Sequence, residues 1–189
     1  IEGALNILEN GHQVRDLDVM YCVERAFLIS LSVGVGANSI VGIGREDKQQ
    51  YGLFAYYLNG ARQFLEIVPQ SFSLRLDGEW IHGAFIEVAI LNMGITGFPE
   101  AFLGGRINPD DGKLRLLTMG QGSIPERALQ SIKGRANGLD SWIQSYDIHQ
   151  VEIHGDSNLV VQGDGDIIGN LPVRVKVLPK AIPVIVPAK

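Results

Sequence analysis

The sequence is poor in cysteine, in unbroken apolar runs and in basic charge, and each shortage excludes a class of protein. One cysteine, Cys22, cannot form an internal disulfide, and there is no Asn-x-Ser/Thr acceptor, so we expect a reducing, cytoplasmic compartment. The longest apolar stretch, Ala26–Ala37, is interrupted by serine and glycine and is too short to cross a bilayer. A net charge of -5 argues against a nucleic-acid surface.

The size and composition are those of one folded domain. Hydrophobic residues make up 46% of the 189 positions, which is enough for a core. The chain begins at Ile1 without a methionine and without a basic segment leading into an apolar one, so we expect no signal peptide. The same beginning suggests a piece of a longer protein, with residues 1–189 as a single domain.

Alternating apolar and polar residues predict a chain made mostly of strands. The pattern in Phe72–Leu76 is that of a half-buried strand, and Asp77-Gly78 then predicts a hairpin turn before Trp80–Leu91. The apolar tract Val19–Gly36 predicts one or two buried strands. Further strands are expected at Lys113–Met119, Trp142–Tyr146, Gln150–His154 and Leu159–Gln162.

The C-terminal segment carries the same alternation twice. Val173–Val177 reads as one strand, and Ile182–Val186 reads as a second strand after a break at Pro179-Lys180. Pro183 removes a backbone donor and places that last strand at a sheet edge. We therefore expect a β-hairpin here, preceded by an acidic turn.

Two amphipathic segments predict helices among the strands. Apolar residues spaced three and four apart indicate a helix over Gln49–Ile67, which Pro69 stops. A capping box at Ser123–Glu126 predicts a shorter helix that ends near Gly138. The fold class expected is mainly β, a β-sandwich or irregular barrel of antiparallel strands with these two helices packed on it.

The acidic turn of Gly163, Asp164, Gly165 and Asp166 is the first candidate site. Glycines on both sides of Asp164 permit positive φ values, which would bring the two carboxylates out of the sheet together. Aspartate and glycine are also ordinary turn formers, so a simple hairpin turn is the alternative.

The loop from Gly104 to Leu114 is the second candidate. Two adjacent carboxylates, Asp110 and Asp111, precede a glycine and a strand. Hard cations bind oxygen atoms arranged around a sharp turn, so Asp111 with nearby backbone carbonyls is a candidate Mg²⁺ ligand. A solvated Asp-Asp-Gly turn is the alternative. The four histidines have no metal-ligand spacing, and Cys22 reads as a buried thiol.

The order of these motifs resembles the C-terminal half of diacylglycerol-kinase-type lipid kinases, which include bacterial diacylglycerol kinases and sphingosine kinases. The resemblance covers nearly the whole chain. It is carried by Asp16-Leu17-Asp18, Ser32–Ala37, the Tyr51–Leu65 helix, Asn92, Gly104-Gly105, Pro109, Asp110-Asp111-Gly112, Asp164-Gly165-Asp166 and the Val173–Pro179 ending.

The resemblance implies roles for individual residues. Asp166 matches the general base that acts on the lipid hydroxyl, with Asp164 beside it, although the family more often has glutamate at that position. The carboxylate of Asp111 and the main-chain oxygens of Asn108 and Lys113 match the family's Mg²⁺ site, in a loop that is shorter here than usual.

The resemblance also implies a function and partners. The chain would be the lipid-side domain of a two-domain kinase that transfers a phosphoryl group from Mg²⁺-ATP to diacylglycerol or a related lipid. The Gly-Gly-Asp-Gly nucleotide loop of the family's N-terminal domain is missing from this sequence, so the domain alone is expected to be inactive. Peripheral contact with a membrane is implied, and no nucleic acid. The alternative is a non-catalytic lipid-binding or regulatory β-sandwich module.

Overall fold

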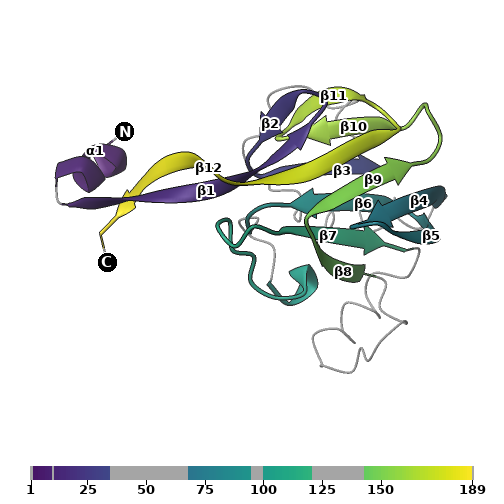
Figure 1. The fold of residues 1–189 in the computed structure, drawn as a ribbon, viewed down its shortest axis with the longest axis horizontal. Helices are drawn as coiled ribbons and strands as arrows, with labels where there is room; N and C mark the ends of the chain where they lie inside the picture. Colours follow the sequence, from purple (N-terminus) through teal and green to yellow (C-terminus); the bar gives the residue numbers. More distant parts are fainter. Residues whose placement is uncertain (1, 10, 35–67, 95–99, 121–142, 189) are drawn as a thin grey trace.

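The computed structural model describes residues 2–9, 11–34, 68–94, 100–120 and 143–188. These residues form two six-stranded antiparallel sheets, which lie face to face (Figure 1). The strand order is β2-β1-β12-β9-β4-β5 in the first sheet and β11-β10-β3-β6-β7-β8 in the second. The described strands do not close into a barrel, so of the two predicted architectures the sandwich is confirmed.

Several strands of the first sheet alternate between core and outward residues, as half-buried strands should. In β4 and β9, for example, the even and odd positions take opposite sides of the sheet. The bounds are β1 His12–Cys22, β2 Arg25–Phe27, β4 Gln70–Leu76, β5 Glu79–Phe85, β9 Gln150–His154 and β12 Val173–Pro187.

The second sheet contains the most buried strand of the described chain. All five residues of β6 are buried, so both of its faces are covered. The bounds are β3 Ser30–Gly34, β6 Glu87–Leu91, β7 Leu114–Met119, β8 Ile143–Ile148, β10 Val160–Gly163 and β11 Asp166–Asn170.

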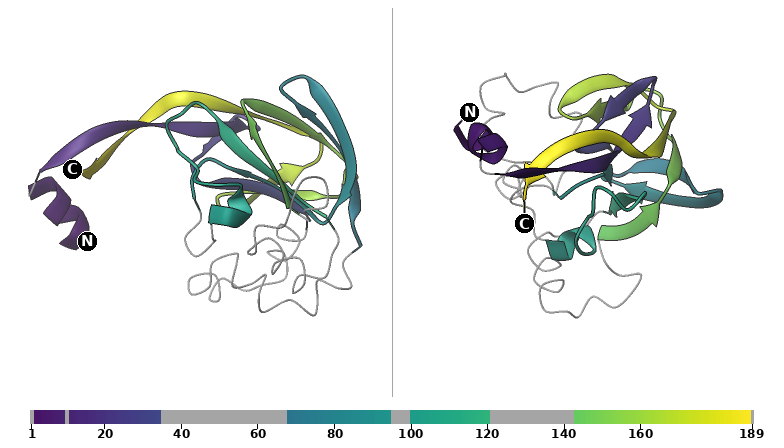
Figure 2. Two further views of the ribbon diagram at one scale, coloured as in Figure 1. Left: turned by 90° about the horizontal axis from the view of Figure 1, so that it is seen from below. Right: turned by 60° about the vertical axis from the view of Figure 1, so that its left-hand side comes forward.

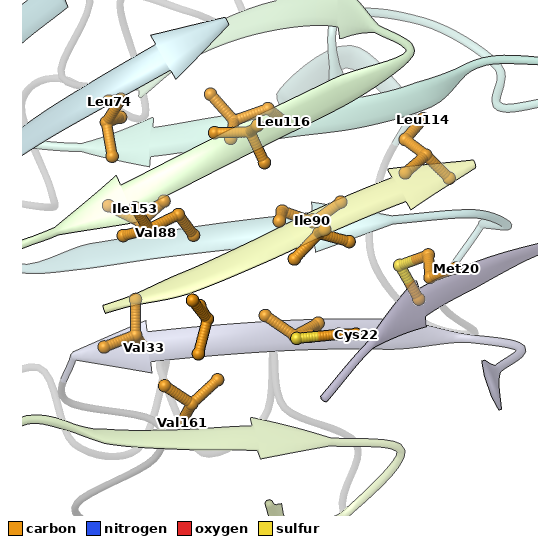
Figure 3. Packing of buried hydrophobic residues seen from close by; sticks show 14 of the residues in the cluster. Met20, Cys22, Val33, Leu74, Val88, Ile90, Leu114, Leu116, Ile153 and Val161 are labelled. Atoms are coloured by element: carbon orange, nitrogen blue, oxygen red, sulfur yellow. The ribbon is translucent and has the colours of Figure 1, made fainter. Parts of the chain in front are cut away.

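The core lies between the two sheets. Figure 3 shows Met20, Leu74 and Ile153 of the first sheet pointing toward residues of the second. Their partners include Ile90 and Leu116, both fully buried. Each such side chain stabilises the fold by about 1.5–3 kcal/mol through removal of apolar surface from water. The sandwich is therefore held by the inward-facing positions of both sheets.

A two-stranded ribbon extends beyond the sandwich. Residues 12–17 of β1 pair with residues 182–187 of β12, and α1 (Glu2–Glu9) precedes β1 (Figures 1 and 2). The ribbon has no core, because Val14 is 63% exposed and Ile185 is 48% exposed. Both ends of the described chain lie at its far end (Figure 2).

The predicted hairpin turn at Asp77-Gly78 is confirmed, but the predicted second strand, Trp80–Leu91, is divided between β5 of the first sheet and β6 of the second. Residues 70–76 of β4 pair with residues 79–85 of β5, and the two loop residues have φ values of 47° and 106°. Positive φ at both central positions is the requirement of a type I′ turn, which Asp-Gly meets well. The described part of the tract Val19–Gly36, up to Gly34, forms the end of β1 and then β2 and β3.

The predicted C-terminal hairpin is wrong. Val173–Pro187 is one strand, β12, that pairs with β1 on both sides of Pro179-Lys180. The pairing register shifts at Asp18, and Lys180 takes a φ of 51° opposite it and donates its N–H to the Asp18 carboxylate at 2.8 Å. The break expected from proline is thus absorbed by an irregularity within a continuous strand.

Both predicted helices, Gln49–Ile67 and Ser123–Gly138, lie outside the described residues. The helices of the described chain are α1 and a short 3-10 helix, η3, at Glu100–Leu103. Neither of these two was predicted.

Candidate functional site

The acidic segment is itself the turn of the β10–β11 hairpin. Gly163 pairs with Asp166, and between them Asp164 and Gly165 have φ values of 47° and 91°. This is again an Asp-Gly loop of type I′ geometry. The segment therefore follows a strand and begins another, whereas the sequence reading placed it ahead of a hairpin.

Gly163 was expected to permit a positive φ, but the structure requires glycine there for a steric reason. Its φ is not positive, and a Cβ at this position would lie 2.5 Å from the ring of Phe27. Phe27 is buried in the core cluster, so its ring has little room to move. Gly163 thus permits close packing of β10 on Phe27, while Asp164 and Gly165 supply the turn.

The Asp164 carboxylate is bound to the connection between β2 and β3. It accepts the N–H groups of Leu28 at 2.7 Å, Ile29 at 2.9 Å and Ser30 at 2.8 Å. The Asp164 N–H in turn donates to the Ser30 carbonyl at 2.9 Å. Three amide donors fix this carboxylate and hold the hairpin against residues 28–30.

Asp166 contrasts with Asp164 in its bonding. It is exposed at the first position of β11. Within the described residues its carboxylate makes no hydrogen bond or ion pair. Of the two acids in the turn, Asp164 anchors it and Asp166 has no partner in the part of the chain that the structure describes.

Asn92, directly after β6, holds the same 28–30 connection from its other side. Its N–H donates to Ile29 O at 3.1 Å, and its side-chain amide donates to Leu28 O at 3.0 Å and Asp18 O at 2.7 Å. Asn92 is fully buried, and its Oδ1 has no hydrogen-bond donor among the described residues. A buried amide of this kind fixes the positions of two chain segments at once.

Asp18 connects this network to the second candidate loop. Its carboxylate is fully buried and accepts the N–H of Gly112 at 2.6 Å and that of Lys180 at 2.8 Å. The Asp18 N–H donates to the Pro109 carbonyl at 2.7 Å. Hydrogen bonds therefore run from the Asp164 turn through residues 28–30, Asn92 and Asp18 to the loop.

The loop itself places its two carboxylates differently. Asp110 accepts a 2.7 Å bond from Arg15, which holds the pKa of Asp110 below its ordinary value. Asp111 uses Oδ1 to accept the Lys113 N–H at 3.0 Å, a local turn that leaves Oδ2 without a partner among the described residues. Asn108 and Lys113 flank this turn. Asp111 is the more accessible carboxylate for a ligand.

The organising residues of this site are Asp18 and Asn92, which the sequence reading noted only as part of a motif order. In the sequence, Asp18 and Asn92 were recognisable only as polar residues within or beside apolar strands. Both are buried because the two sheets meet at these positions. Within the described chain no three His, Cys, Asp or Glu side chains gather as a metal cluster. None of the described helices is long and apolar enough to span a membrane.

Comparison with known proteins identifies the domain. Residues 30–186 match the family described as the YegS C-terminal NAD kinase beta sandwich-like domain. Two solved structures of a putative diacylglycerol kinase from Bacillus anthracis strain Sterne are similar in fold. They give TM-scores of 0.75 and 0.68 at 20% and 18% identity, and the aligned parts cover 95% and 90% of this chain.

An uncharacterized protein of Synechocystis is 25% identical over the whole chain. The chain spans only part of these relatives: 60% and 57% of the Bacillus proteins' chains and 45% of the Synechocystis protein. The sandwich of two antiparallel sheets agrees with the family description, and the resemblance to the C-terminal domain of diacylglycerol-kinase-type lipid kinases is confirmed. The chain belongs to the YegS C-terminal NAD kinase beta sandwich-like domain family.

Proposed function

We propose that the chain is the lipid-side domain of a kinase that transfers a phosphoryl group from ATP to a hydroxyl of diacylglycerol or a related lipid. The observation that supports it best is the different bonding of the two carboxylates in the acidic turn, Asp164 and Asp166. Asp164 is fixed by three amide donors, so Asp166, two residues on and without a partner among the described residues, is held at a defined place. A displayed carboxylate is what general-base catalysis of hydroxyl attack requires.

Asp164 has a positioning role in this proposal. Its carboxylate oxygens already accept three N–H groups, so they are poorly available to accept a substrate proton. Asp166 would accept that proton as the hydroxyl attacks. Aspartate is one methylene shorter than the glutamate more common in the family, so the turn must approach the substrate more closely.

The loop at Asp111 fits a magnesium ion by its donor types. One accessible carboxylate oxygen, with the backbone oxygens of Asn108 and Lys113 and with water, is an all-oxygen set. Mg²⁺ commonly binds through one or two carboxylates and keeps several waters. When bound, the ion would offset negative charge on the phosphates.

A nucleotide-binding domain belongs to this proposal as a partner. The relatives are longer than this chain, and both ends of the described chain lie together at the tip of the exposed ribbon (Figure 2). A domain joined there would bring ATP, while the sandwich would contribute the base. The isolated domain is then expected to be inactive.

The test is phosphorylation of diacylglycerol in mixed micelles by the longer protein with labelled ATP. Asp166→Asn should lower kcat by about 100-fold or more, because the base is lost while the turn is kept. Asp166→Glu should retain most of the activity, and Asp156→Asn, on the connection before β10, serves as a control with the same loss of charge. An Asp166→Asn enzyme as active as the wild type would refute the base assignment.

A second candidate is a lipid-binding or regulatory module without chemistry. The aspartate at position 166 and the short metal loop favour it. If the longer wild-type protein binds lipid but phosphorylates neither diacylglycerol nor a sphingoid base, this candidate replaces the kinase.

A further inference from the structure

The outward face of the first sheet carries an organised polar surface. We call it the outer face and define it by Arg75, Trp80, His82, His154, Arg174 and Lys176, which occupy outward positions of β4, β5, β9 and β12. The neighbouring positions on these strands, such as Leu74, Ile153 and Val175, point into the core. The outer face is thus a product of strand alternation.

The strand register aligns all of these side chains except Lys176 in two rows. Ser73 of β4 lies opposite both His82 of β5 and His154 of β9. In the next row Arg75 lies opposite Trp80 and Glu152, and Glu152 lies opposite Arg174. Residues from four strands, some of them distant in sequence, therefore share the outward surface of the sheet.

The outer face is positively charged although the whole chain has a net charge of -5. The outward positions of β4, β5 and β9 and of Val173–Val177 in β12 carry three cations, Arg75, Arg174 and Lys176, and one carboxylate, Glu152. The Glu152 carboxylate lies 3.7 Å from the Arg75 guanidinium and 3.8 Å from His154 Nε2. Arg174 donates to the neutral Gln150 side chain at 2.7 Å, and Lys176 lies 5.2 Å from the Tyr21 ring centre. Two of the three cations therefore have no acidic partner among the described residues.

An exposed tryptophan lies at the edge of this charged surface. Trp80 is 48% exposed on β5, an edge strand. Its ring stacks on the His82 ring, with 5.9 Å between the ring centres and 3° between the ring planes. The centre of the His154 ring lies 5.5 Å from that of the indole. Arg75 lies 6.0 Å from the same ring. These contacts hold the indole in place beside a shallow depression lined by Ser73 and both histidines.

We propose that the outer face docks on the surface of an anionic phospholipid bilayer. Clustered basic side chains attract the negative surface of a membrane, and tryptophan favours the boundary between headgroups and hydrocarbon. The outer face, with an exposed indole on its edge strand, presents both together. The inference rests on the proposed function, because a lipid substrate resides in a bilayer.

The experiment is co-sedimentation of the chain with vesicles of phosphatidylcholine alone or mixed equally with phosphatidylglycerol. Binding should require phosphatidylglycerol and should weaken as salt is raised. In a Trp142→Phe background, which leaves Trp80 as the remaining tryptophan, emission should shift to shorter wavelength on binding. Equal binding to neutral vesicles, or no binding to anionic vesicles at low salt, overturns the proposal.

Matched charge reversals locate the surface. Arg174→Glu should lower the partition coefficient at least about tenfold and Arg174→Gln about fivefold. Arg106→Glu, an equal change of charge at an exposed residue in the loop before β7, should have little effect. If Arg106→Glu weakens binding as much as Arg174→Glu, net charge explains the attraction and the outer face is not the docking surface. Preferential binding of a single-stranded oligonucleotide that displaces the vesicles would also overturn it.

Failure of this inference can be told from failure of the proposed function. If Arg174→Glu in the longer protein abolishes vesicle binding but leaves phosphorylation of lipid in detergent micelles intact, docking and chemistry are separate and both proposals stand. If the longer protein phosphorylates lipid in micelles and Arg174→Glu binds anionic vesicles normally, the kinase stands and the outer face fails. If vesicle binding depends on Arg174 but no lipid is phosphorylated, the outer face stands and the kinase fails.

Discussion

Asp77 and Asp164 have the same two roles in two different hairpins: each forms the turn and each binds a distant connection through its carboxylate. Each takes a left-handed φ of 47° before a glycine, and each uses its carboxylate to accept N–H groups from a connection elsewhere in the fold. Asp77 binds the amides of His149 and Gln150, the latter at 2.8 Å, and Asp164 binds residues 28–30. Aspartate suits both needs, because it tolerates this conformation and has two acceptor oxygens.

Replacing Asp164 should destabilise the fold through the loss of these bonds. We expect Asp164→Ala to lower the free energy of unfolding by about 2 kcal/mol, because three N–H groups lose a charged acceptor and alanine disfavours positive φ. Asp164→Asn keeps one carbonyl oxygen and should lose about half as much. Urea denaturation measures both. A change in Asp164→Ala within about 0.5 kcal/mol of zero would show that the bonds are not stabilising.

Asp77 should make stability depend on pH. Partial burial opposes its ionisation, but the N–H groups of His149 and Gln150 and the His149 ring outweigh that effect and lower the pKa of Asp77. A carboxyl with a lowered folded-state pKa contributes stability above the unfolded-state pKa, about 3.9, and this contribution is lost as pH falls through the folded-state value.

Asp77→Asn tests this dependence. The side chain is 38% exposed, so after allowance for solvent screening we expect a loss of only about 1 kcal/mol at pH 7. The difference from wild type should shrink as pH falls below about 4. Asp16→Asn, an exposed residue of the ribbon, should show neither effect. A difference that stays constant from pH 7 to the acid limit would contradict the prediction.

At the scale of the element, the β1–β2 turn differs from the Asp77-Gly78 and Asp164-Gly165 turns, because it has positive φ values without a glycine. The loop between β1 and β2 has positive φ at Val23, 48°, and Glu24, 59°, with no glycine and no asparagine. A β-branched residue in this region is strained. Since Val23 is 51% exposed, its side chain gains little from burial to offset the strain.

Substituting the residues that this turn prefers should stabilise the protein. Val23→Asn with Glu24→Gly makes an Asn-Gly loop and should raise the free energy of unfolding by about 1 kcal/mol. Val23→Thr, which stays β-branched, should change it little. The denaturation midpoint should rise at unchanged slope. If the double variant is less stable than wild type, the β1–β2 turn does not carry the strain that its dihedrals indicate.

Strands were easier to predict from sequence than their connections and pairings. Residues 70–85 alternate on either side of an Asp-Gly pair, so the hairpin follows from local chemistry. The C-terminal segment alternates equally well, but its continuity across Pro179-Lys180 depends on Asp18, a residue more than 160 positions away. No local pattern could reveal that bond.

At the scale of the whole molecule, the sandwich and the ribbon should differ in local stability. The sandwich buries both inner faces, whereas residues 12–17 and 182–187 form two strands with exposed apolar residues. A two-stranded ribbon without a core is marginal by itself.

Amide hydrogen exchange should separate the two regions. Ribbon amides should exchange at least about 100-fold faster than those of β4 and β9, because opening the ribbon exposes little core. Exchange followed by mass spectrometry, fragment by fragment, measures the ratio. Equal protection of ribbon and sandwich would mean that the ribbon opens only with the whole fold.

Cys22 is a residue whose environment the sequence predicted correctly. The sequence indicated a buried thiol from its apolar surroundings, and the structure agrees, since burial raises the pKa of Cys22 to about 11. At neutral pH the thiol is therefore protonated and unreactive. This property followed from composition around one residue.

The sequence alone determined the mainly β fold, most strand positions, the Asp77-Gly78 hairpin and the family resemblance, because these depend on alternation and turn chemistry within a few residues. Only the tertiary structure decided that Asp164 is an anchor, that Asp18 and Asn92 link the acidic turn to the Asp111 loop, and that three cations gather on one face. Those facts depend on hydrogen bonds and register between strands far apart in the chain, which no local pattern encodes.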